Sequence, residues 1–102
     1  MSQDILDNLK KLQKKYQTLG FFIIGIFGSR ARGDETKESD IDILYDLDKN
    51  FVKQYGGWGA ISEIQKIKEE IKKTLHLEVD LASADNNSKT FQKVIKDELI
   101  YV

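Results

Sequence analysis

The stretch GSRARGDETKESDIDILYDL, residues 28–47, joins a glycine turn to a polar loop and then to a segment that alternates apolar and acidic side chains. The alternation predicts a strand over 40–47 with an apolar face and an acidic face. Asp40 and Asp42 share the acidic face, with Cα atoms about 6.6 Å apart. At that separation two carboxylates repel by roughly 2.5 kcal/mol at an effective dielectric of about 20, so the pair needs a compensating cation.

A third carboxylate occupies a similar position further along the chain. Asp80 lies in HLEVDLA, where alternation predicts another strand over 76–82. If that strand lies beside residues 40–47, three carboxylates converge on one patch. Oxygen ligands without a neighbouring histidine or cysteine suit Mg²⁺. Two of the acids could hold the metal while the third accepts a proton from an attacking hydroxyl, as phosphoryl transfer requires.

The glycine turn at the beginning of the stretch has the composition of a phosphate-binding turn. Gly28 follows the apolar run FFIIGIF, which predicts a central strand over 21–27, and Ser29 can begin a short helix. Free backbone N–H groups at such a turn bind phosphate, and the Ser29 hydroxyl can add a hydrogen bond. Arg30 and Arg32 could neutralise phosphate charge, although surface salt bridges explain either arginine equally well. Together with the carboxylates, the turn indicates a metal-dependent nucleotide site.

The rest of the chain supplies helices and strands for one α+β domain, residues 1–102, whose strand order the sequence leaves open. The segment from Ile61 to Leu75 carries an isoleucine and leucine stripe at helical spacing that is expected to face the core. Residues 49–59 are predicted to form a loop, in which Trp58 could cover a nucleotide base, contact a partner or pack on the core. The expected helices span 4–16, 61–75 and 91–99, and the expected strands span 21–27, 40–47, 76–82 and 100–102.

The composition excludes several classes of function. Among 102 residues, 16 are basic and 17 acidic, so the net charge of −1 does not favour bulk nucleic-acid binding. The absence of cysteine excludes disulfides, thiolate catalysis and cysteine-ligated metals. The longest apolar run, residues 20–28, is too short to span a membrane, and the first residues lack a signal-peptide core, so we expect a cytoplasmic protein.

The spacing of these motifs resembles a known signature. Gly28-Ser29, ten residues and then Asp40-Ile41-Asp42 is similar to the Gly-Ser…Asp-x-Asp pattern of the DNA polymerase β-like nucleotidyltransferase superfamily. The fuller GSRARG…SDIDILYDL and the closing IKDELIYV resemble the minimal nucleotidyltransferases, small antitoxins encoded beside HEPN-domain ribonuclease toxins.

The resemblance implies a small mixed sheet flanked by helices and a specific division of roles. Gly28 and Ser29 would hold the triphosphate of ATP, and Asp40 and Asp42 would bind Mg²⁺. Asp80 would complete the carboxylate set and activate the acceptor hydroxyl. Attack on the α-phosphate would release pyrophosphate and place AMP on a tyrosine of a HEPN toxin, with which the protein would form a hetero-oligomer.

The sequence leaves two other functions open. The protein could be an inactive antitoxin that inhibits by occlusion, although intact Asp40, Asp42 and Asp80 argue against loss of activity. It could also modify a small molecule, as aminoglycoside nucleotidyltransferases do. The larger relatives bind such acceptors with an additional domain. A chain of this length has no room for that domain.

Overall fold

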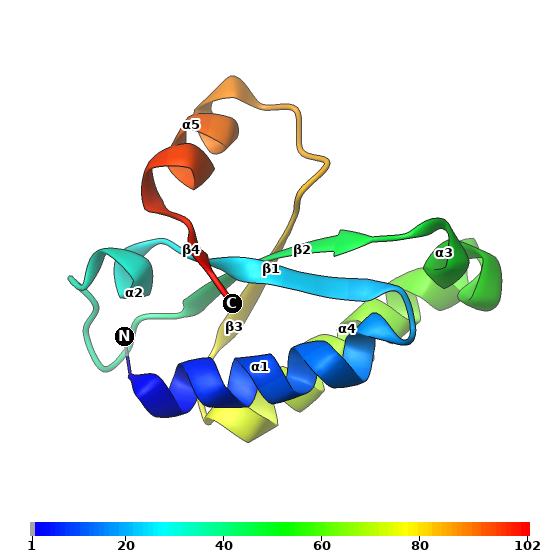
Figure 1. Ribbon diagram of the computed structural model, residues 1–102, viewed down its shortest axis with the longest axis horizontal. Coiled ribbons are helices and arrows are strands. Elements are labelled where there is room, and N and C mark those ends of the chain that lie inside the picture. Colours follow the sequence, from blue (N-terminus) through cyan, green and yellow to red (C-terminus); the bar gives the residue numbers. More distant parts are fainter. Residues whose placement is uncertain (1) are drawn as a thin grey trace.

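The computed structural model describes residues 2–102 and contains one four-stranded sheet with helices on both faces (Figure 1). The strand order is β3-β2-β1-β4. The helices are α1 (Gln3–Gln17), α2 (Ser29–Arg32), α3 (Lys49–Tyr55), α4 (Gly57–Leu75) and α5 (Lys89–Glu98), and the strands are β1 (Phe21–Phe27), β2 (Ile41–Leu47), β3 (Val79–Ser83) and β4 (Ile100–Tyr101).

The sheet is mixed, as the resemblance implies. Strand β1 pairs antiparallel with both β2 and β4, whereas β2 and β3 are parallel. Parallel neighbours require a crossover connection, which α3 and α4 provide. The prediction of an α+β domain with a small sheet is therefore confirmed, and the structure adds the strand order that the sequence leaves open.

The hydrophobic core lies on one face of the sheet. Figure 1 shows α1 and α4 side by side on that face and α5 on the other. Apolar side chains at alternate strand positions meet the apolar stripes of the two helices, which removes them from water. The side chains that are fully buried there are Leu9, Phe21, Ile23, Ile26, Ile41, Ile43, Phe51 and Ile71.

The predicted loop over 49–59 is wrong, because the structure has helix α3 and the first turn of α4 in this segment. Asp48 caps α3 by accepting a hydrogen bond from the Phe51 N–H at 3.0 Å, and Phe51 is buried. Trp58 lies in α4 with 87% of its surface exposed, so it does not pack on the core. An aspartate cap followed by an aromatic residue is the local signal for this helix.

The predicted apolar stripe of α4 needs one correction. Ile61 is 61% exposed, and the buried position in that turn is Ala60. Residues 60, 64, 67, 71 and 75 form the stripe that faces the sheet, and Ile61 falls one position beside it. No helix in residues 2–102 combines the length and the apolar character needed to cross a bilayer.

Candidate active site

Three carboxylates approach one another where β2 and β3 begin. Asp42 of β2 is directly paired with Asp80 of β3, which puts their Cα atoms about 4.8 Å apart, and Asp40 precedes β2 by one residue. Burial raises the pKa of the Asp42 carboxyl, and the charges of Asp80 and Asp40 raise it further. The structure thus gathers negative charge at this end of the sheet.

The glycine turn lies directly against this carboxylate group. Gly28 has φ 78° and ψ −158°, and Phe27 beside it pairs with Asp42. A Cβ at Gly28 would lie 2.1 Å from Asp42 Oδ2, so the close approach requires glycine for space as well as for its positive φ. Ser29 then begins α2, and the Gly28 carbonyl accepts the N–H groups of Ala31 and Arg32. The turn and the carboxylates form one site.

Arg30 fixes the loop that leads to Asp40. Its side chain is only 8% exposed, and Nε and Nη2 both donate to the Ser39 carbonyl, at 3.1 and 2.8 Å. This contact differs from the surface salt bridge that the sequence offers as an alternative. Ser39 is adjacent to Asp40, so these hydrogen bonds support a role for Arg30 in positioning Asp40. They support this role more directly than a contact of Arg30 with a ligand.

Arg32 is held by two carboxylates at the edge of the site. Its Nε donates to Asp34 Oδ2 at 3.1 Å, and its Nη1 donates to Glu98 Oε1 at 3.0 Å. The same Glu98 oxygen accepts the Gly28 N–H at 3.1 Å. Glu98 lies in the closing stretch IKDELIYV, but nothing in the sequence assigns it to the site; a carboxylate in the last turn of a helix opposes the helix dipole, which indicates a compensating partner elsewhere.

The residue types at this site are suitable for binding Mg²⁺ as phosphate-transferring proteins bind it. The carboxylates of Asp40, Asp42 and Asp80 offer oxygen ligands, and a divalent cation would offset the burial and the mutual repulsion that raise the Asp42 pKa. Within residues 2–102, no three acidic or histidine side chains are already arranged to hold a metal ion. The arrangement therefore fits a cation held by one or two carboxylates together with substrate phosphates and water, rather than an all-protein cage.

Comparison with known sequences gives a consistent result. Residues 7–102 match the family described as Polymerase beta, Nucleotidyltransferase. A Methanocaldococcus jannaschii protein that is named as a protein adenylyltransferase is 37% identical, with 98% of this chain and 93% of that protein aligned. Protein adenylyltransferase MntA of Thermococcus cleftensis is 28% identical, with 91% of this chain and 83% of that protein aligned.

Two solved structures share the fold. A structure described as a minimal nucleotidyltransferase superimposes with a TM-score of 0.74 at 19% identity, covering 100% of this chain and 97% of that one. A toxin–antitoxin crystal structure with AMP-PNP gives a TM-score of 0.63 at 18% identity, covering 93% of this chain and 69% of that one. At these identities the two structures support the fold alone.

Proposed function

The chain belongs to the polymerase beta nucleotidyltransferase family, and we propose that it transfers AMP from ATP to a hydroxyl group of a partner toxin and so acts as an antitoxin. The observation that carries this proposal is the contact of the Gly28 turn with Asp42, which itself is paired with Asp80. A phosphate-binding turn and a set of carboxylates thereby share one site. The relatives named as protein adenylyltransferases support a protein acceptor.

The phosphate-binding part of the site consists of Gly28, Ser29 and Arg32. The N–H groups of the turn and the Ser29 hydroxyl would donate to phosphate oxygens, and Arg32 would neutralise part of their charge. Asp40 and Asp42 would hold Mg²⁺, which when bound neutralises the charge of the triphosphate and of the pyrophosphate that leaves. Arg30 would keep Asp40 in place through its hydrogen bonds to the Ser39 carbonyl.

Asp80 is the group that we propose to accept the proton. It is exposed, and its charge helps to raise the pKa of Asp42. The acceptor oxygen would attack the α-phosphorus, a new P–O bond would form, and the bond to the pyrophosphate group would break. The hydroxyl proton would pass to Asp80, so that charge and atoms balance.

The proposed acceptor is a tyrosine hydroxyl of a HEPN-domain toxin. We place the reaction in the cytoplasm, where ATP is available. The resemblance to minimal nucleotidyltransferases and the fold shared with a toxin–antitoxin structure support this choice.

A labelled-nucleotide assay tests the proposal. ATP labelled at the α-phosphate, Mg²⁺ and the toxin encoded beside this chain should give label on the toxin, and a chelator should abolish it. Asp42→Asn should lower the rate by about 10³-fold or more. Asp46→Asn is the matched control, because Asp46 lies on the same strand face, away from Asp80.

Each other outcome has a definite meaning. Tight binding of the toxin without label would indicate inhibition by occlusion and would overturn the proposed reaction. Label on a hydroxylated small molecule but not on the toxin would indicate an aminoglycoside-like activity. Full activity of Asp42→Asn would overturn the metal role of Asp42.

A further inference from the structure

Glu98 is a carboxylate in an unfavourable position on its own helix. It is the last residue of α5, where the partial negative charge of the helix end repels an anion. Its side chain is only 19% exposed, and its charge contributes to raising the Asp42 pKa. The contacts that compensate for this position lie about 70 residues earlier in the chain, at the glycine turn and at Arg32.

These contacts coincide with the proposed triphosphate contacts. Glu98 Oε1 accepts the Gly28 N–H at 3.1 Å and Arg32 Nη1 at 3.0 Å. A carboxylate oxygen that bridges a backbone amide and a guanidinium makes the same pair of hydrogen bonds as a phosphate oxygen would make. A phosphate oxygen on the Gly28 N–H would therefore take the position of Glu98, and the two anions would repel strongly at such a distance.

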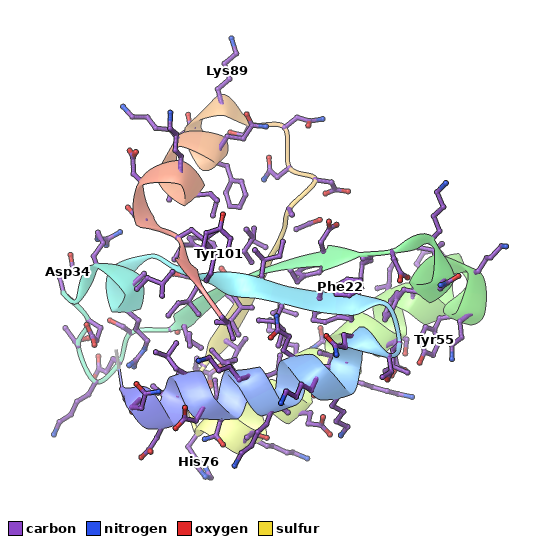
Figure 2. All side chains as sticks on the ribbon, viewed as in Figure 1. Phe22, Asp34, Tyr55, His76, Lys89 and Tyr101 are labelled. Carbon is purple, nitrogen blue, oxygen red and sulfur yellow. The ribbon has the colours of Figure 1, made fainter. Side chains whose placement is uncertain are left out.

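Helix α5 is attached weakly to the sheet, so its last turn, which carries Glu98, can move away from the glycine turn. Unlike the other helices, it has no buried residue. Its aromatic contact with the sheet is an edge-to-face pair of Phe91 with Phe27, at 5.7 Å between ring centroids. A groove of about 190 Å³ remains between the helix and the sheet, lined in part by Leu44, Phe91 and Ile95. Figure 2 shows Lys89, at the beginning of α5, projecting away from the sheet.

We propose that Glu98 is an internal competitor of the triphosphate: nucleotide binding replaces its carboxylate on the Gly28 N–H and on Arg32, and so releases the last turn of α5. This inference rests on the proposed function, since it concerns the same site. In the nucleotide-free protein, Glu98 therefore lowers the affinity for ATP, and nucleotide binding changes the position of α5. Strand β4, which follows directly, keeps its pairing with Gly25, where a Cβ would lie 2.3 Å from the Ile100 carbonyl oxygen.

Equilibrium binding to matched variants tests the competition. Glu98→Gln removes the negative charge and keeps an oxygen that can accept both hydrogen bonds, so the fold should be retained. We expect its affinity for Mg²⁺-ATP and for inorganic tripolyphosphate to rise about tenfold, because a charged acceptor no longer has to be displaced. Asp97→Asn is the control, since it makes the same charge change at an exposed neighbouring position and should alter affinity less than about twofold.

Hydrogen exchange provides a second, independent readout. In the wild-type protein, ATP should accelerate amide exchange in the last turn of α5 and leave the core strands unchanged. Equal or weaker nucleotide binding by Glu98→Gln, or slower exchange of α5 with ATP, would make Glu98 an anchor of the helix and overturn the competition. If neither the wild type nor Glu98→Gln binds ATP or tripolyphosphate, the proposed function itself fails.

Discussion

The two faces of the sheet differ in how they use the same strand. On β2, Ile41 and Ile43 point toward α1 and α4 and are fully buried, whereas Asp42 between them points to the face that carries α5. One face removes apolar surface from water, while the other gathers carboxylates that repel one another. The core face supplies stability, whereas the acidic face carries the residues that we propose to bind a cation and phosphates, at some cost in stability.

The helices on the two faces reflect this difference. Helix α4 buries Ala60, Ile67, Ile71 and Leu75, whereas α5 buries no residue fully. The attachment of α5 instead includes polar contacts of Glu98 with the glycine turn and with Arg32. A helix held by exchangeable hydrogen bonds can respond to a ligand more readily than a helix held by a packed core.

The largest expected change in the free energy of unfolding comes from a substitution on the core face. Ile43→Ala should lower the free energy of unfolding by about 3–4 kcal/mol, because it leaves a cavity in a fully buried site. Leu44→Ala, one residue away under α5, should lower it by only about 2 kcal/mol, because Leu44 already borders a groove. Urea denaturation measures both. Equal losses would show that the two faces contribute equally to stability.

On the acidic face, removal of a charge should increase stability. Without metal and nucleotide, Asp42→Asn should raise the free energy of unfolding at pH 7 by about 0.5–1 kcal/mol, since it removes a partly buried charge and its repulsion by Asp80 and Asp40. The folded pKa of Asp42 lies above the ordinary 3.8, so the wild type loses stability as pH rises from 3.8 through that raised value. The advantage of the variant should therefore be full at pH 7 and disappear below pH 3.8.

Thermal unfolding at several pH values checks this expectation. Asp46→Asn, on the same strand face but exposed, is the control and should change stability by less than about 0.3 kcal/mol. A loss of stability in Asp42→Asn at pH 7 would mean that the Asp42 charge has a compensating partner in the free protein.

Local sequence patterns predict the two faces well and their long-range contacts poorly. Alternation alone places Asp42 opposite to Ile43, and the structure agrees. The pairing of Asp42 with Asp80 depends on a parallel strand that arrives after two helices, so spacing along the chain could not establish it. Arg30 binds a backbone carbonyl, and Glu98 contacts a turn about 70 residues away; neither partner leaves a pattern in the sequence.

The smallest expected change in the free energy of unfolding comes from Glu70, a charged residue that stabilises the helices on the core face. Glu70 of α4 accepts hydrogen bonds from Lys15 Nζ at 2.8 Å and from the Tyr16 hydroxyl, and so ties α4 to α1. These hydrogen bonds hold the Glu70 pKa below its ordinary 4.5. Because both ion-pair partners are substantially exposed and screened by water, Glu70→Gln should cost only about 0.5 kcal/mol at pH 7.

The pH dependence of this variant should be opposite to that of Asp42→Asn. A lowered folded pKa means that the Glu70 charge stabilises the protein above pH 4.5 and that this contribution is lost as pH falls through the lowered value. Glu69→Gln, at the neighbouring exposed position, is the control and should have little effect. If Glu70→Gln instead gained stability at pH 7, carboxylates would destabilise both sides of the sheet, and the contrast between the core face and the acidic face would not hold.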